Sequence, residues 1–316
     1  MADNKGLLGR GWSKVKHNKR YIFWFWLMNL ALGMIGASVF KGQAHTILGN
    51  NLYADRLVHG FDISVLVEMF ARPEFGPTSG AFEAGFHSAI IFFLATAIFL
   101  PGVFQGYASN YRLPRDEFFR ACGRNLWRFI RLLIIAGIVM GVVAGALFAL
   151  HGFLEGRAEE STNEMLLPWV RGIGLAVIFL AMTTLRICFD LAEADVVLND
   201  QQAVRHSAGI GFRHTFRNLG KLLGSYLITT IMALIILGTG LVVWLNWIPA
   251  KSTTRAFLLA QLILLLLLIP RFWQRGIAVA YWQEKIAVTL APTIPVVAPV
   301  VPASPVIPIT PVVEGV

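Results

Sequence analysis

Four stretches of the chain carry no Asp, Glu, Lys or Arg and are long enough to cross a bilayer. About 20 residues of α-helix, rising 1.5 Å per residue, cross the roughly 30 Å hydrocarbon layer. All four stretches reach that length, so each predicts a transmembrane helix. They are residues 21–40, 84–111, 132–154 and 222–250.

Two shorter apolar stretches, 172–185 and 256–270, are each bounded by arginine. Arginine can keep its stem in the apolar layer while its head reaches the headgroups, so these stretches can also span. We therefore expect an all-α fold, a polytopic membrane helix bundle with a transmembrane domain at 21–285. The six predicted helices cover about 21–40, 84–107, 132–152, 169–190, 222–245 and 254–275.

Composition agrees with this pattern, because only 14% of the residues are charged, against about a quarter in soluble domains. Residues 1–20 form a basic leader before the first span. That span is longer than the core of a signal peptide, and no cleavage site with small residues follows it. We expect it to remain as a membrane anchor.

The cationic side chains are divided unevenly between the two sides that six crossings define. One side receives 20 of the 27 Lys and Arg residues and the other receives 7, whereas the acidic residues divide evenly. Basic loops stay in the cytoplasm. We therefore expect both termini to be cytoplasmic, and we read the charge of +9 as a topology signal and not as a nucleic-acid site.

A basic stretch occurs twice, as FRACGRNL from Phe119 and FRHTFRNL from Phe212. At helical spacing the arginines of the first copy form one stripe, which Arg131 extends. Each copy leads into a span, so we expect short basic interfacial helices on the cytoplasmic side that contact anionic headgroups. A duplicated unit that grips a partner or a lipid phosphate is the alternative. The candidate contact residues are Arg120, Arg124, Arg128, Arg213, Arg217 and Lys221.

Glycines form a second stripe within the third span, at Gly137, Gly141 and Gly145. Small residues at this spacing let another helix approach closely in lipid. The stripe predicts a packing surface, and we expect the partner helix to be internal, with a second subunit as the alternative.

The fourth span ends with three ionisable residues at helical spacing, Arg186, Asp190 and Glu193. The spacing from Arg186 to Asp190 suits an ion pair on one helix face. A structural pair at the inner boundary is one interpretation. The other is a path for protons or cations, because ionisable groups near membrane depth are candidate functional sites.

Two segments differ in character from the spans. The outer loop, residues 41–83, contains DISVLVEMFARP, which predicts a short helix from Asp62 to Pro73. From about residue 286 to 316 a tail has proline at nearly every third position. That period matches polyproline II, so the tail is either disordered or a docking segment.

The letters Phe189-Asp190-x-Ala192, followed by Val196, Asp200 and residues 212–222, resemble a broad group of bacterial six-span membrane proteins of unknown function. The chain is more distantly similar to the membrane domain attached to some glycerophosphodiester phosphodiesterases. The resemblance covers roughly residues 84–275 and implies a fold and a bacterial inner membrane. It implies no activity, because the chain contains no catalytic phosphodiesterase domain.

The sequence contains no known catalytic motif. We find no zinc-binding spacing, Walker loop, dinucleotide fingerprint or nucleophile elbow. We therefore expect no enzyme, no cofactor and no metal site. The expected role is a scaffold, assembly or envelope component that contacts anionic lipid and a protein partner or a second copy. The alternative is a small-solute transporter or channel that uses Asp190 and Glu193.

Overall fold

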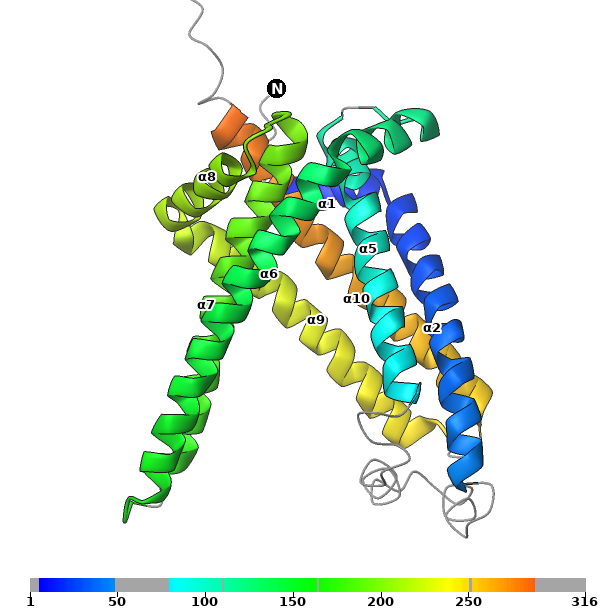
Figure 1. Cartoon of the computed structure of the whole chain (residues 1–316), viewed down its shortest axis with the longest axis vertical. Coiled ribbons are helices and arrows are strands. Elements are labelled where there is room, and N and C mark those ends of the chain that lie inside the picture. The colour runs from blue at the N-terminus through cyan, green and yellow to red at the C-terminus, as the bar shows by residue number, and fades with distance from the viewer. Residues whose placement is uncertain (1–5, 49–79, 110, 164, 250–251, 288–316) are drawn as a thin grey trace, which may run out of the picture.

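The computed structural model describes residues 6–48, 80–109, 111–163, 165–249 and 252–287, and within these ranges it contains helices and turns but no strand. Figure 1 shows the helices as one bundle. In chain order they are α1 (Leu7–His17), α2 (Arg20–Leu48), α5 (Gly80–Ala108), α6 (Arg115–Glu159), α7 (Leu166–Leu198), α8 (Val204–Arg217), α9 (Leu219–Trp247), α10 (Thr253–Tyr281) and the π-helical turn η2 (Trp282–Ile286).

Five helices in the described part of the chain are long and apolar enough to cross a membrane. This confirms the predicted all-helical membrane architecture. In α2, the apolar segment within the residues that the structure describes in full is shorter, Arg20–Ile35. The five candidate spans are Ile90–Ala108, Arg115–Glu159, Leu166–Leu198, Leu219–Trp247 and Thr254–Ile286.

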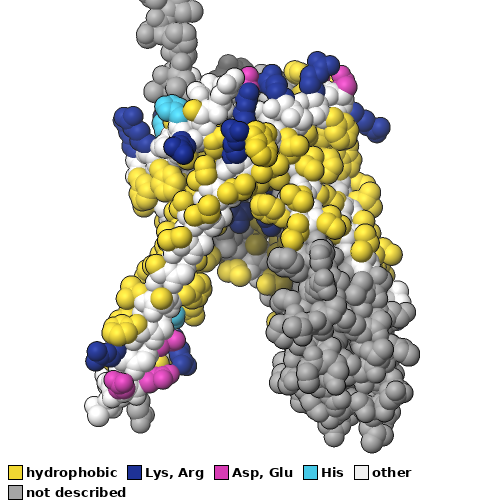
Figure 2. Space-filling model, viewed as in Figure 1, with side chains coloured by type: hydrophobic (Ala, Val, Ile, Leu, Met, Phe, Trp, Pro, Cys, Tyr) yellow, Lys and Arg dark blue, Asp and Glu magenta, His cyan; other side chains and the backbone are white. Residues whose placement is uncertain are grey.

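The helices form two legs that meet at one end (Figure 1). The α6–α7 hairpin makes one leg, and α2, α5 and the lower parts of α9 and α10 make the other. We call the meeting point the basic end and define it as α1, α8 and the first four turns of α6. Figure 2 shows Lys and Arg side chains gathered there, above a broad apolar belt.

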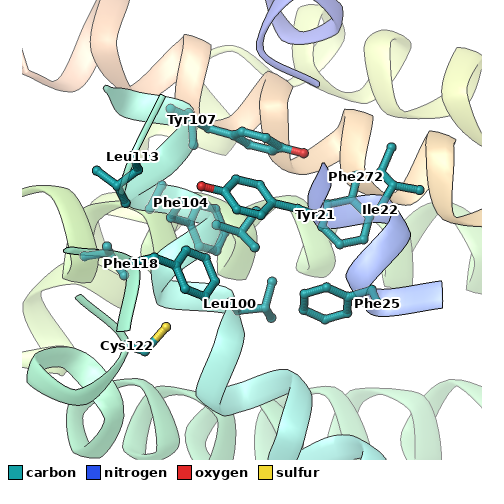
Figure 3. Close-up of a cluster of buried hydrophobic side chains, with 14 of the residues drawn as sticks. Tyr21, Ile22, Phe25, Leu100, Phe104, Tyr107, Leu113, Phe118, Cys122 and Phe272 are labelled. Carbon is teal, nitrogen blue, oxygen red and sulfur yellow. The ribbon is translucent and has the colours of Figure 1, made fainter. Parts of the chain in front are cut away.

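Aromatic packing holds α2, α5, α6 and α10 together near the basic end (Figure 3). The rings of Tyr21 and Phe118 stack with centroids 5.3 Å apart, and Phe25 meets Phe272 edge-on at 5.0 Å. Edge and offset contacts of this kind are the favoured aromatic geometries. The side chains at the centre of this core are fully or almost fully buried: Tyr21, Phe25, Phe104, Phe118, Phe129 and Phe272.

The two amphipathic helices α1 and α8 each cross the last turns of a long helix at a glycine. A Cβ on Gly11 of α1 would lie 2.7 Å from the Ile277 side chain of α10. A Cβ on Gly211 of α8 would lie 2.2 Å from the Cys188 carbonyl oxygen of α7. These separations are far below van der Waals contact, so both crossings require a residue without a side chain.

An asparagine in each basic segment bonds to its own helical turn, as Asn29 and Asn246 within the spans also do. In the two copies read from the sequence, the amides of Asn125 and Asn218 donate to the carbonyl oxygen four residues earlier, at 3.0 and 3.5 Å. Asn18, after α1, makes the same bond to Lys14 at 3.3 Å. Four residues beyond each asparagine, a buried apolar side chain enters the core, and these are Ile22, Phe129 and Leu222.

The copies differ in how they join their spans. A separate short helix was expected at the first copy, but α6 runs unbroken for 45 residues from Arg115 to Glu159. In the second copy the chain breaks at Asn218, between α8 and α9. Helix α2 also continues to Leu48, beyond its expected end at residue 40. The predicted helix at 62–73 and nearly all of the 286–316 tail lie outside the described residues.

Candidate functional site

A buried polar network joins α7, α9 and α10 below the basic end. The hydroxyl of Tyr226 donates to Asp190 Oδ2 at 2.8 Å and lies 3.2 Å from the carbonyl oxygen of Gln274. Asp190 is 7% exposed and Tyr226 is 1% exposed. A buried carboxylate of this kind needs such a partner, because an unpaired charge away from water is costly.

Gln274 continues the network toward α9. Its side-chain amide donates to the hydroxyls of Thr229 and Thr230, at 3.1 and 3.2 Å. Thr229 in turn donates to backbone carbonyl oxygens of its own helix. The network therefore fixes the relative register of α9 and α10 beside the carboxylate on α7.

Charges around Asp190 come from two helices. The guanidinium Nε of Arg186 lies 3.9 Å from Asp190 Oδ2. Glu193 and Arg275 are buried, at 7% and 6% exposed, and both interact electrostatically with Asp190. Arg271 is exposed and also interacts with Glu193 and Asp190. Three cations thus surround two carboxylates.

The network contains buried polar atoms that lack a hydrogen-bond partner among the described residues. They include Glu193 Oε2 and Arg275 Nε. Unsatisfied buried polar groups are rare in proteins and call for a specific explanation. Arg186 on α7 is half-buried and Arg271 on α10 is exposed. Figure 2 shows Lys or Arg side chains at the top of the hollow between the legs. The arrangement can receive a proton or hold a small charged group.

Three members of this site, Arg186, Asp190 and Glu193, were predicted from the sequence, and the others were not. Arg186 and Asp190 do form the expected i,i+4 pair. Both carboxylates are buried. The missed residues come from helices distant in sequence: Tyr226, Thr229, Thr230, Arg271, Gln274 and Arg275.

Asp195 is a third buried carboxyl group, and the sequence did not single it out. It is fully buried, and its Oδ1 accepts a hydrogen bond from the indole nitrogen of Trp282 at 3.0 Å. The bond ties the last turns of α7 to η2. Asp195 Oδ1 therefore has a structural partner, whereas Asp195 Oδ2, like Glu193 Oε2, has none among the described residues.

Two arginines of the first basic stripe hold the α7–α8 turn. Arg128 donates to the carboxylate of Asp200 and, at 3.2 Å, to its carbonyl oxygen, and Arg124 lies 3.6 Å from that carboxylate. Asp200 has a positive φ of 51°, a conformation that Asp adopts more readily than most residues. Arg120 is exposed and has no hydrogen bond or ion pair among the described residues.

The second basic copy leaves its cations at the surface. Arg213, Arg217 and Lys221 are all exposed. Burial, followed by the charges of Arg213 and Arg217, lowers the pKa of His214. This histidine is therefore neutral at pH 7, and the positive charge of this face comes from the arginines and the lysine.

The glycine stripe on α6 has no internal partner among the described residues. A Cβ added at Gly137, Gly141 or Gly145 would meet nothing within 4 Å. Among the described residues, the expected internal packing is therefore not seen at these three glycines. A second subunit remains as the alternative partner.

The remaining chemistry of the chain is sparse. Both cysteines, Cys122 and Cys188, are buried and unpaired. Within the described part of the chain, no group of three or more His, Cys, Asp and Glu side chains could hold a metal ion. In comparisons with known proteins, no family model, no curated protein and no solved structure matches the chain.

Proposed function

We propose that this chain is a non-enzymatic protein of the bacterial inner membrane with six spans and both termini in the cytoplasm. Helix α2 is the sixth span: its 29 residues extend about 43 Å at the helical rise, more than the hydrocarbon thickness. The basic end then faces the cytoplasm, as the distribution of Lys and Arg favours. The resemblance to bacterial six-span proteins supports the choice of membrane.

At this end the protein gathers anionic lipid and acts as a scaffold or assembly component. The observation that carries this proposal is the row of exposed cations beside the apolar belt. Each Lys or Arg near an anionic surface contributes about 1 kcal/mol. The short helices α1 and α8 serve as interfacial helices, since each combines buried apolar residues with exposed cations. The exposed cations without an ion pair among the described residues include Lys16, Arg120, Arg213, Arg217 and Lys221.

Charge reversal at the basic end tests this proposal. Arg120, Arg213 and Arg217 are exchanged together for Glu, which leaves the Arg124–Asp200 and Arg128–Asp200 pairs intact. We expect the purified protein to lose phosphatidylglycerol relative to phosphatidylcholine in native mass spectrometry. The control is Arg157→Glu at the opposite end of α6. An unchanged lipid composition in the triple variant would refute the proposed lipid contact.

A second candidate function, passage of protons or another small solute, is favoured by one observation. Glu193 carries a buried carboxylate oxygen without a hydrogen-bond partner among the described residues. Ionisable groups within the membrane mark ion paths in many transporters. In proteoliposomes loaded with a pH-sensitive dye, Glu193→Gln and Asp190→Asn should each abolish proton flux, and Glu155→Gln should not. Equal flux in all proteins, or none in the wild type, removes this candidate for protons.

A further inference from the structure

An apolar groove opens where α2, α5 and α6 meet at the basic end. Its volume of about 510 Å³ lies within the range of small-molecule sites. The groove occupies the first turns of α2 and α6 and the last turns of α5. In the proposed orientation this is the depth at which lipid headgroups meet acyl chains. The lining residues are Trp24, Phe25, Met28, Phe99, Arg115, Phe118 and Phe119.

The wall of the groove is rigid because its rings pack against one another. Phe118 stands edge-on to both Trp24 and Phe119, with centroids 5.6 and 5.5 Å apart. Phe99 makes similar contacts to Phe25 and Phe119. Figure 3 shows Phe118 and Phe25 entering the same core from different helices. A wall of interlocked rings is already formed before any ligand arrives.

A close helix contact sets the position of Phe118. A Cβ on Gly102 of α5 would lie 2.5 Å from the Phe118 ring and 2.7 Å from Cys122 Sγ. Only glycine permits α6 to approach α5 so closely. The groove is therefore a feature of the fold, and not a gap left by loose packing.

One cation marks the mouth of the groove. Arg115 lines it, is exposed, and has no hydrogen bond or ion pair within the described residues. It is the first residue of α6, where free backbone N–H groups and the helix dipole favour an anion. Asp116 and Glu117 share this turn, but neither lines the groove. The Glu117 carboxylate accepts a hydrogen bond from the Tyr111 hydroxyl at 2.9 Å.

A second arginine at this end is already engaged. Arg20 donates to the carbonyl oxygen of Leu113, and its guanidinium carbon lies 5.7 Å from the centroid of the Trp24 ring. It therefore braces the segment before α6 against α2. Arg115 remains as the cation of the groove that is able to receive a ligand.

We propose that this groove holds one anionic phospholipid, with an acyl chain along the aromatic wall and the phosphate group at Arg115. An apolar channel that ends at an unpaired cation is complementary to an amphiphile with a negative head. The position in the proposed membrane selects a lipid over a soluble amphiphile. This site is distinct from the row of surface cations, because it combines a chain-binding wall with a single arginine.

Native mass spectrometry of the full-length protein in vesicle-derived lipid tests the proposal. With equal phosphatidylglycerol and phosphatidylcholine, the wild type should retain one phosphatidylglycerol that resists collisional removal. Arg115→Gln should lower the retention of phosphatidylglycerol relative to phosphatidylcholine by roughly fivefold, the contribution of one cation at a membrane surface. Arg157→Gln, which removes an exposed cation at the far end of α6, should leave the ratio unchanged.

A variant that fills the groove provides a second test of the proposal. Met28→Trp should remove the tightly held lipid of either headgroup while the thermal unfolding temperature of the protein stays close to that of the wild type. Loss in Met28→Trp but an unchanged ratio in Arg115→Gln would show a groove that does not select anionic lipid, and would overturn the proposal. No loss in either variant would overturn it as well. The triple reversal of Arg120, Arg213 and Arg217 should spare this lipid, so the two proposals can fail separately.

Discussion

The ammonium group of Lys14 on α1 bonds to the end of α5 and to η2. It donates to the carbonyl oxygen of Tyr107 at 2.8 Å and to Gln283 Oε1 at 2.6 Å. Burial, followed by repulsion from Arg10, lowers the pKa of Lys14 from 10.5 to about 8. The charged form is thus less favourable in the folded protein than in the unfolded chain.

The lowered pKa predicts how stability depends on pH. Between about pH 8 and 10.5 the unfolded chain keeps the Lys14 proton and the folded protein releases it. The unfolded state then binds more protons, so the free energy of unfolding contributed by this site rises with pH. Lys14→Met should remove this rise in thermal unfolding measured in detergent from pH 7.5 to 10. The exposed Lys16→Met is the control, and an identical slope in both variants would contradict the assignment.

The polar network depends on the buried hydroxyl group of Tyr226. Tyr226→Phe keeps the ring but leaves Asp190 without its donor, so we expect a loss of about 1–3 kcal/mol in the free energy of unfolding. Chemical denaturation in mixed micelles measures this change. Tyr111→Phe removes an exposed hydroxyl, and its effect should stay within about 0.5 kcal/mol. Equal effects of the two substitutions would show that the network does not stabilise the fold.

At the scale of elements, the crossing of α7 and α8 depends on a single glycine. Gly211→Ala would place a Cβ 2.2 Å from the Cys188 carbonyl oxygen, and a backbone atom in a long helix cannot easily move. Overpacking of this kind costs about 1–3 kcal/mol. We expect Gly211→Ala to lower the unfolding temperature and to expose α8 to limited proteolysis.

Gly209 supplies the matched control on the same helix. A Cβ there would meet nothing within 4 Å, and alanine is favoured over glycine in a helix by up to about 1 kcal/mol. Gly209→Ala should therefore leave the unfolding temperature unchanged or raise it. If both alanine substitutions had the same effect, helix propensity and not the crossing would account for it.

The positions of the long helices could be read from the sequence, but their faces and partners could not. Apolar length is a local property, so the spans from α5 to α10 fall where the charge-free stretches predict them. Contacts are not local. The leader lacks the arginine spacing of the two basic copies, and its close contact with α10 at Gly11 could not be predicted from that stretch alone. The glycines at 137, 141 and 145 predicted an internal contact that is not seen among the described residues.

The candidate site shows the same division. The spacing of Arg186 and Asp190 on one helix was sufficient to predict their pair. Tyr226 lies 36 positions after Asp190, and Gln274 lies 48 positions after Tyr226. The periodicity of a single helix cannot connect residues so far apart. The presence of Tyr226 and Gln274 within apolar spans indicates that each needs a polar partner, because buried polar side chains are normally hydrogen-bonded. Which partner each one finds is decided by helix packing.

At the scale of the whole molecule, the packing between helices is concentrated at the basic end. The most apolar windows of α6 and α9 are each only 11% buried, whereas that of α5 is 44% buried. Two legs joined at one end leave a large apolar surface for lipid or a second copy to cover. The polar cap at the tip of the α6–α7 leg, where Arg171 donates to Glu155 at 2.9 Å, closes the apolar belt at the opposite end.

This architecture makes a definite prediction for accessibility. Helix α7 has 33 residues and is about 50 Å long, which exceeds the roughly 40–45 Å of a bilayer with its headgroups. The exposed residues Thr162 and Gln202, beyond its two ends, must then lie on opposite sides. With both native cysteines buried, a membrane-impermeant maleimide should label Thr162→Cys in intact cells and Gln202→Cys only after permeabilisation. Labelling of both from the same side would disprove the membrane orientation on which the lipid proposals depend.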